Sequence, residues 1–246
     1  FRGEVEFSHV NFSYDGVKPI IKDFSIKIKP GMQVAIVGPT GAGKTTIVSL
    51  LMRFYDIQSG EIKIDGVSTK QMKRSEVRGL FGMVLQDTWL FSGTILENLK
   101  YGSSNVTFEQ VEAAAKMTGV DHLVKSLPDG YETKIFEDSD NISAGEKQLL
   151  TITRAIIANP KMMILDEATS NVDTRTEQII QRAFDKLTEG RTSFVIAHRL
   201  STIRNADIIL VMKEGNIVEH GNHDELMKLD GFYAELYNSQ FSEEAE

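Results

Sequence analysis

The stretch that decides the fold is an apolar run, Gln33–Val37, followed directly by Gly38-Pro39-Thr40-Gly41-Ala42-Gly43-Lys44-Thr45. It matches in full the pattern G-x-x-x-x-G-K-[ST] of a phosphate-binding loop, and it lies between a predicted strand and a predicted helix, as that loop requires. Glycines here let backbone N–H groups turn inward around phosphates, and the start of the helix adds its dipole. We expect Lys44 to contact β- and γ-phosphate oxygens and the Thr45 hydroxyl to bind Mg²⁺. The alternative is an ordinary Gly-rich turn before a helix, but such a turn would not explain the presence of Lys44 and Thr45 at these positions.

Composition and charge exclude several classes of protein. The 246 residues include 27 Lys and Arg against 35 Asp and Glu, a formal net charge of −8, with 41% hydrophobic and 25% charged residues. This is globular composition, and the acidic balance argues against general nucleic-acid binding. The absence of cysteine excludes disulfides and thiol chemistry. No apolar run approaches the roughly 18–20 residues of a membrane span, and we expect no signal peptide in this sequence. Because the chain starts at Phe1, we expect an excised domain or processed fragment, with any membrane role in parts outside this chain.

Apolar periodicity predicts an α/β fold. Residues 5–28 alternate on either side of an Asp15-Gly16 turn, which predicts antiparallel strands, and Gly60–Asp65 adds another strand. Strands and one hairpin are also predicted in the remaining core, at Gln33–Gly38, Met162–Leu165, Phe194–Ala197, and Ile208–Met212 with Ile217–Glu219. Helices are predicted at Lys44–Tyr55, at Thr176–Leu187 and, as a closing helix, from His223.

Residues 88–158 have helical spacing and few strand signals, so we expect a helical insertion there. The predicted architecture is a P-loop NTPase core with a mainly parallel sheet, an N-terminal antiparallel β subdomain and a helical insertion subdomain. The core with its β subdomain comprises residues 1–87 and 159–246, the insertion comprises 88–158, and the tail Ser242–Glu246 is expected to be loose.

An acidic pair, Asp166-Glu167, follows the buried strand Met162–Leu165. A carboxylate at the carboxyl end of such a strand reaches the sheet edge beside the phosphate loop, so we expect Asp166 to hold Mg²⁺. Neighbouring strand residues point to opposite sides, so Glu167 can approach the γ-phosphate and its attacking water. An isolated Asp-Glu pair is usually a solvated turn, but the buried strand and the upstream phosphate loop favour the functional interpretation.

Ser143-Ala144-Gly145-Glu146 forms a capping box, S-x-x-E, ahead of the helical run Leu149–Ala158, which stops before Pro160. One interpretation is an ordinary helix start. The other is a second helix N-terminus with a glycine, suited to a further phosphate contact. The residues alone leave both open.

The set of motifs resembles the nucleotide-binding domain of ATP-binding cassette (ABC) transporters, from Val5 to about Leu236. Ile142–Glu146 stands where that family carries L-S-G-G-Q, and differs from it at Ile142, Ala144 and Glu146. The resemblance implies that Ser143 and Gly145 contact phosphate.

The resemblance also assigns an adenine-stacking ring to Tyr14, the Q-loop glutamine to Gln86, the D-loop to residues 170–173 and the switch histidine to His198. Taken alone, each of these residues has an ordinary structural explanation, but together they follow one another along the chain in the same order as the motifs of the family. The implied nucleotide-binding residues are Tyr14, Gly38, Pro39, Thr40, Gly41, Ala42, Gly43, Lys44, Thr45, Thr46, Ser143, Gly145 and Glu146. The implied catalytic residues are Glu167, His198, Lys44 and Gln86, and the implied Mg²⁺ ligands are Thr45, Gln86 and Asp166.

The spacing of the five histidines indicates no histidine metal site; His220 and His223 are interpreted as a loop residue and a helix cap.

Residues 86–95 and 221–226 resemble the exporter branch of the family. The resemblance implies an ATPase that uses ATP and Mg²⁺. It also implies a head-to-tail pairing with a second, identical or homologous nucleotide-binding domain. An attached transmembrane domain would place the nucleotide-binding domain at the cytoplasmic face of the cell membrane. A soluble ABC protein for DNA repair or translation would carry a second cassette or long coiled-coil insertions, which 246 residues do not hold. A regulatory switch with a dead site is disfavoured because Glu167 and His198 are both present.

Overall fold

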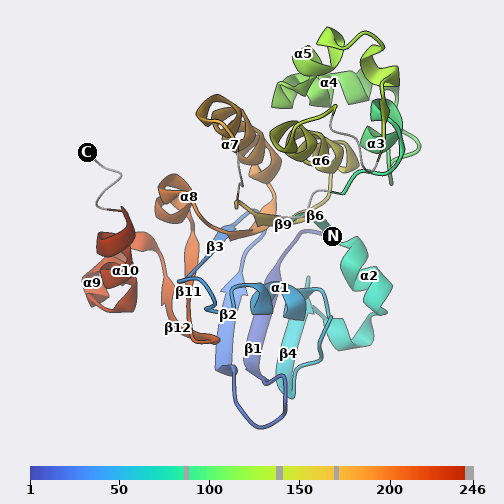
Figure 1. Cartoon of the computed structure of the whole chain (residues 1–246). Helices are drawn as coiled ribbons and strands as arrows, with labels where there is room; N and C mark the ends of the chain where they lie inside the picture. The colour runs from blue at the N-terminus through green and yellow to red at the C-terminus, as the bar shows by residue number, and fades with distance from the viewer. Residues whose placement is uncertain (86–88, 137–140, 169–171, 242–246) are drawn as a thin grey trace. The chain divides into compact units, whose positions relative to one another are not determined.

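A computed structural model describes residues 1–85, 89–136, 141–168 and 172–241 of the chain (Figure 1). The chain forms two compact units. The first consists of residues 1–81, 161–167 and 190–246, and the second of residues 82–160 and 168–189.

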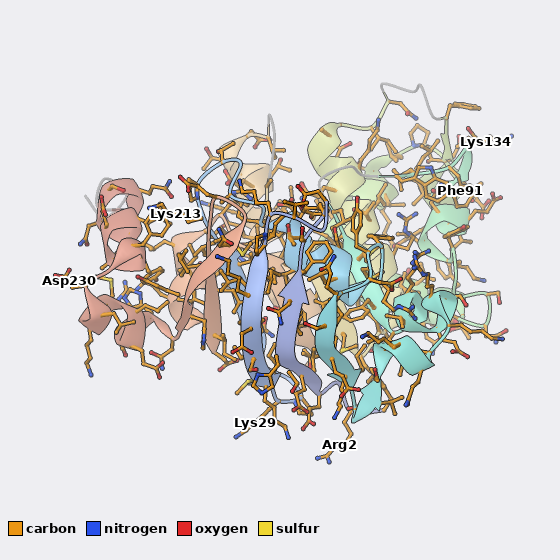
Figure 2. All side chains as sticks on the ribbon, turned by 90° about the horizontal axis from the view of Figure 1, so that it is seen from below. Arg2, Lys29, Phe91, Lys134, Lys213 and Asp230 are labelled. Carbon is orange, nitrogen blue, oxygen red and sulfur yellow. The ribbon has the colours of Figure 1, made fainter. Side chains whose placement is uncertain are left out.

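The first unit contains an antiparallel sheet in the order β2-β1-β4-β5. Its strands are β1 (Val5–Phe12), β2 (Ile21–Ile28), β4 (Ser59–Ile64) and β5 (Val67–Ser68). Val5 pairs with Ile28 on one side and with Ile64 on the other, so the alternating apolar side chains of β1 share one buried face. Arg2 and Lys29 project from the same end of this sheet in Figure 2, as antiparallel pairing requires. The predicted antiparallel subdomain is confirmed.

The first unit also contains a mainly parallel sheet, in the order β12-β11-β3-β10-β9. The strands are β3 (Gln33–Val37), β9 (Met162–Asp166), β10 (Thr192–Ile196), β11 (Ile208–Lys213) and β12 (Asn216–Gly221). Only the β11–β12 pair among these is antiparallel, and it is the predicted hairpin. The continuous apolar run of β3 is explained by burial on both faces: Val34 and Ile36 belong to one core cluster and Ala35 and Val37 to another.

Helices of the first unit cover these two core clusters. They are α1 (Thr45–Leu51), α2 (Arg74–Gly79), α8 (Leu200–Asn205), α9 (His223–Leu229) and α10 (Phe232–Phe241), with a 3₁₀ turn at Thr69–Gln71. Helix α1 contributes to the cluster that contains the β1 side chains, and α8, α9 and α10 contribute to the other. The helix predicted over Lys44–Tyr55 ends at Leu51, because Arg53 adopts a left-handed φ of 53°. The Arg53 guanidinium then donates to the carbonyls of Thr69 and Met72, 2.8 Å from each.

The second unit is mainly helical. It begins within β6 (Phe81–Val84) and contains the short antiparallel pair β7 (Gly93–Thr94) and β8 (Lys134–Ile135). Its helices are α3 (Ile95–Leu99), α4 (Phe108–Thr118), α5 (Val120–Ser126), a 3₁₀ turn at Gly130–Glu132, α6 (Ala144–Ala158) and α7 (Thr174–Thr188). The predicted boundaries, 87/88 and 158/159, leave α7 in the core. The structure groups α7 with the second unit, because it packs on α6 and α4 (Figure 1).

The predicted fold class, an α/β protein with an antiparallel β subdomain and a mainly parallel sheet, is confirmed. Two smaller predictions are wrong: His220 lies within β12, and the cap of α9 is Asn222, with His223 the first helical residue. Across the described ranges, no helix is long and apolar enough to cross a bilayer.

Candidate nucleotide-binding and catalytic site

The phosphate loop lies between β3 and α1, and its glycines are required by its geometry. Gly41 and Gly43 have φ angles of 81° and 86°, which L side chains rarely adopt. A Cβ on Gly38 would lie 2.5 Å from the carbonyl oxygen of Met212 on the neighbouring strand. The loop is closed by a hydrogen bond from Ala42 N to Pro39 O, 3.0 Å long. This cradle of backbone fits a phosphate chain.

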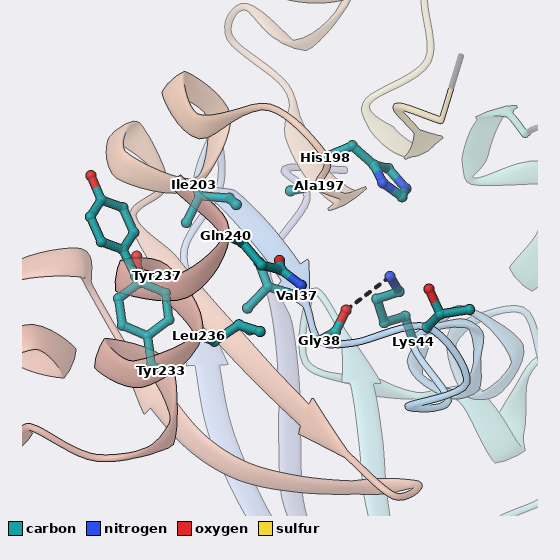
Figure 3. A pocket seen from close by; sticks show the side chains of 11 residues that line it. Val37, Gly38, Lys44, Ala197, His198, Ile203, Tyr233, Leu236, Tyr237 and Gln240 are labelled. Carbon is teal, nitrogen blue, oxygen red and sulfur yellow. Dashed lines mark hydrogen bonds between the residues drawn. The ribbon is translucent and has the colours of Figure 1, made fainter. Parts of the chain in front are cut away.

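Lys44 folds back over this loop. Its Nζ donates to the carbonyl oxygen of Gly38 at 3.1 Å, drawn as the dashed line in Figure 3. Within the described part of the chain, the Lys44 ammonium has no carboxylate partner. A phosphate that binds at the loop therefore does not have to break an ion pair of Lys44. An anionic ligand at the loop gains a point charge there.

A cavity of about 160 Å³ opens beside Lys44 (Figure 3). The end of β3, the loop after β10 and helix α10 form its walls. Its lining residues are Val37, Gly38, Thr40, Lys44, Ala197, His198, Ile203, Tyr233, Leu236, Tyr237 and Gln240. Sequence patterns gave no sign that the C-terminal helix reaches the phosphate loop.

Helices α9 and α10 are joined by a histidine–tyrosine contact on this wall. His223 Nδ1 and the Tyr233 hydroxyl are 2.8 Å apart, and the rings of His223 and Tyr237 are in contact, with centroids separated by 4.8 Å. Burial, and secondarily the charge of Arg204, lower the pKa of His223 from its ordinary value of 6.5.

Tyr14 lies two residues after the end of β1, with 48% of its surface exposed. Its hydroxyl is 3.0 Å from the hydroxyl of Thr46 in α1, and its ring meets the rings of Phe12 and Tyr55 edge-on. The following turn is held by Asp15, whose pKa is lowered to about 2 because its carboxylate accepts hydrogen bonds from the backbone of Lys18 and Val17. An exposed ring fixed next to the phosphate loop suits stacking on a base, and that role remains a prediction.

The two acids at the end of β9 have different surroundings. Asp166 Oδ1 lies 3.3 Å from Nε2 of His198, whose side chain is 41% exposed. Glu167 is 5% exposed and accepts four hydrogen bonds. The structure therefore brings the predicted catalytic Glu167 and His198 and the predicted metal ligand Asp166 together around one loop, the segment between β10 and α8.

Two partners of Glu167, Arg199 and Thr202, were not predicted from the sequence. Its Oε2 accepts from Arg199 Nε at 2.6 Å and from the Thr202 hydroxyl at 2.7 Å, and its Oε1 accepts from the backbone N–H groups of His198 and Arg199 at 3.2 and 3.4 Å. The available signal was the position of Arg199 directly after His198, where the same loop that carries the histidine can also reach the acid.

The predicted capping box at the start of α6, in the second unit, is confirmed. Ser143 Oγ accepts from Glu146 N at 3.2 Å, and Glu146 Oε2 accepts from Ser143 N at 3.0 Å. Gly145 is buried, and a Cβ there would lie 2.6 Å from Cγ2 of Thr176, whereas Ala144 is exposed. Helix capping and packing therefore account for Ser143, Gly145 and Glu146 locally, and their contact with phosphate remains a prediction.

The model of the ABC transporter family matches residues 21–170, more than half of the chain and including the phosphate loop, the capping box and the acidic pair. The chain belongs to the ABC transporter family. The resemblance proposed from the sequence is thus confirmed.

Relatives within the ABC transporter family align over nearly the whole chain. The fatty acid ABC transporter ATP-binding/permease protein of Mycobacterium tuberculosis is 57% identical over 234 residues, 95% of this chain and 37% of that protein. A probable multidrug resistance ABC transporter ATP-binding/permease protein of Bacillus subtilis, YheH, is 48% identical over 97% of this chain and 35% of its own length. A bacterial Atm1-family ABC exporter solved with ATP bound matches with a TM-score of 0.85 and 42% identity, over 98% of this chain and 42% of that one. The chain spans little more than a third of the length of these two ATP-binding/permease relatives.

Three residues that the ABC resemblance assigned lie outside the described residues: Gln86 in the Q-loop, and Ser170 and Asn171 in the D-loop. The D-loop residue Asp173 is described and caps α7, with its carboxylate accepting from the backbone N–H and the hydroxyl of Thr176. This capping positions the start of α7 against Gly145.

The donor set for Mg²⁺ fits the chemistry of that ion. Thr45 is an exposed residue at the start of α1, and the side chain of Asp166 is 14% exposed at the end of β9. Mg²⁺ prefers such oxygen ligands and is usually held by one or two protein groups together with substrate phosphates. The described residues contain no group of three or more His, Cys, Asp or Glu side chains that could hold a metal ion.

Proposed function

We propose that the chain is the ATP-binding and ATP-hydrolysing domain of an ABC exporter, acting with Mg²⁺ at the cytoplasmic face of a membrane. The observation that carries this proposal is the convergence on one unit of the phosphate loop with Lys44, the acids Asp166 and Glu167, and His198. Membership of the ABC transporter family, with ATP-binding/permease proteins as relatives, supports the same function.

In the proposed reaction, water attacks the γ-phosphorus, the bond to the β-phosphate oxygen breaks, and Glu167 accepts the proton of the water as general base. Lys44 stabilises charge on the β- and γ-phosphates, and His198 contacts the γ-phosphate. Mg²⁺, when held by Thr45, Asp166 and Gln86 with ATP, neutralises charge on the phosphates. The exposed ring of Tyr14 stacks on the base.

The test of the proposed function is Glu167→Gln, which retains size and hydrogen bonding but removes the base. ATP should still bind, while hydrolysis falls by roughly 10²-fold or more. Glu109→Gln is the matched control, because it makes the same chemical change at an exposed position in the first turn of α4 and should leave hydrolysis unchanged. Near-normal turnover by the Glu167→Gln protein would refute the assignment.

The proposed active form pairs two such domains head-to-tail, so that each ATP meets Lys44 of one chain and Ser143 of the other. The exposed Ser143 at the start of α6, whose N-terminal N–H groups suit an anion, supports this arrangement. Dimers of Lys44→Ala chains, or of Ser143→Arg chains, would contain no intact site, but a mixed dimer would contain one. Mixing both variants in a Glu167→Gln background should restore occlusion of about one ATP per mixed dimer, in proportion to chain concentration. Equal trapping by the mixture and the separate variants would contradict the shared site.

The transmembrane domain is proposed to contact the second unit through the segment after Gln86. A cavity of about 150 Å³ lies there, lined by Met83, Val84, Leu85, Trp89, Thr151 and Arg154. Arg154 donates from Nη2 to Trp89 O at 2.7 Å, while its buried Nη1 has no hydrogen-bond partner among the residues described. A buried guanidinium nitrogen with an unused donor favours an incoming carbonyl or carboxylate, which a helix of the partner domain can supply.

A further inference from the structure

The carboxylate of Glu167 is fully used in this structure. A carboxylate offers about four acceptor positions, and Glu167 fills them with two backbone N–H groups, the Arg199 Nε–H and the Thr202 hydroxyl. The two shortest contacts, 2.6 and 2.7 Å, converge on Oε2, and the side chain is 2% exposed. In this position Glu167 has neither a vacant acceptor for the proton of a water nor access to one.

We propose, resting on the proposed role of Glu167 as base, that Arg199 and Thr202 hold Glu167 in a withdrawn position in the nucleotide-free domain, and that hydrolysis requires Glu167 to leave them. The ion pair with Arg199 lies in a site where both side chains are largely buried, 17% and 2% exposed. Charge-assisted hydrogen bonds in such surroundings are the strong ones, so this contact restrains the acid more than an exposed pair would.

The same short segment carries both the restraint and the predicted nucleotide contact. His198 and Arg199 donate through their backbone N–H groups to Glu167 Oε1, while the His198 imidazole faces the cavity beside Lys44 (Figure 3). A displacement of this segment toward a γ-phosphate would lengthen the two weaker bonds first, at 3.2 and 3.4 Å. One movement of the loop between β10 and α8 would therefore bring His198 to the ATP and release Glu167.

This arrangement makes Arg199 and Thr202 positioning residues with an inhibitory effect. Removing them should favour the released position of Glu167 and raise kcat. KM for ATP should stay equal or fall, because the same movement releases Glu167 and brings His198 to the nucleotide. Loss of one hydrogen bond to the buried Glu167 carboxylate should shift the equilibrium between its withdrawn and released positions by about tenfold. We therefore expect kcat to rise by up to about tenfold.

The experiment measures kcat and KM for ATP in the full-length protein that contains this chain, for Arg199→Ala, Thr202→Val and the conservative Thr202→Ser. We expect higher kcat for the first two variants and a wild-type value for Thr202→Ser, which keeps the hydroxyl. A lower or unchanged kcat in both Arg199→Ala and Thr202→Val overturns the proposal. The double variant Arg199→Ala/Glu167→Gln should be as inactive as Glu167→Gln alone, because the gain acts through Glu167.

A structural measurement covers the case in which a variant fails to fold. Crystal structures of the wild-type protein without nucleotide and with a non-hydrolysable ATP analogue should show the Glu167–Arg199 contact only in the first; its persistence with the analogue overturns the proposal. Different results test the role of Glu167 as base and its withdrawn position. An active Glu167→Gln protein refutes the proposed base, whereas an inactive Glu167→Gln protein with no acceleration in either Arg199→Ala or Thr202→Val refutes only the withdrawn position.

Discussion

Replacing Gly145 by alanine is expected to destabilise the second unit. A Cβ at this position would lie 2.6 Å from Cγ2 of Thr176 and 3.2 Å from Cγ1 of Val172, both closer than ordinary van der Waals contact. Thr176 cannot easily turn away, because its hydroxyl donates to Asp173 at 2.6 Å in the cap of α7. The new methyl group must therefore push α6 and α7 apart or force strained side-chain conformations.

Overpacking of this kind typically costs about 1–3 kcal/mol of unfolding free energy. Alanine gains at most about 1 kcal/mol over glycine in helix propensity, and less near a helix start, so the net loss should be about 1–2 kcal/mol. Trp89, the only tryptophan of the chain, belongs to the same compact unit and reports its unfolding by fluorescence. With an ordinary urea dependence, the midpoint should fall by about 0.5 M at unchanged slope.

The matched control is Thr176→Ser, which removes Cγ2 but keeps the hydroxyl that bonds to Asp173. The next nearest Thr176 atom, its Cβ, is 3.7 Å from the position that the new methyl group would occupy, an ordinary contact. Adding Thr176→Ser to Gly145→Ala should therefore recover most of the lost stability relative to Thr176→Ser alone. If Gly145→Ala leaves the urea midpoint unchanged, or if Thr176→Ser does not rescue it, the steric argument is wrong.

Three further outcomes follow from the structure. Tyr14→Ala should weaken ATP and GTP binding by similar factors, corresponding to about 1–3 kcal/mol of lost stacking, while Tyr14→Trp preserves both; an unchanged Kd for Tyr14→Ala in fluorescence titration would contradict the stacking role. Folding lowers the pKa of His223, so the contribution of this residue to stability is complete above its unfolded pKa of 6.5 and is lost as the pH falls below that value. Thermal unfolding measured between pH 7.5 and 5 should therefore show a loss of stability in the wild type. The loss should be smaller in His223→Gln. Arg154→Ala in the full-length protein should reduce substrate-stimulated ATP hydrolysis more than basal hydrolysis, and equal effects on the two rates would argue against a contact with the transmembrane domain.

Local motifs were predictable from the sequence because chain connectivity fixes their geometry. The phosphate loop from Gly38 to Thr45 needs only a strand before it and a helix after it, and its glycines reveal the backbone conformation it adopts. The capping box of Ser143 and Glu146 joins residues three apart, and alternation along β1 and β2 specifies which side chains are buried. In each case, the interacting groups are close in sequence or share a simple period.

The tertiary structure alone decided the contacts made by residues far apart in sequence. Glu167 meets Arg199 and Thr202, 32 and 35 residues later, only because β9 and β10 are parallel neighbours that end at the same edge. Likewise, α10 lines the cavity beside Lys44, and Gly145 is confined by Thr176, through packing that no periodicity encodes. The sequence determined that this chain has an ABC-type phosphate loop with an acid at a neighbouring strand end. Packing determined that the acid is held by an arginine, because a buried carboxylate takes whichever donors the fold brings within reach.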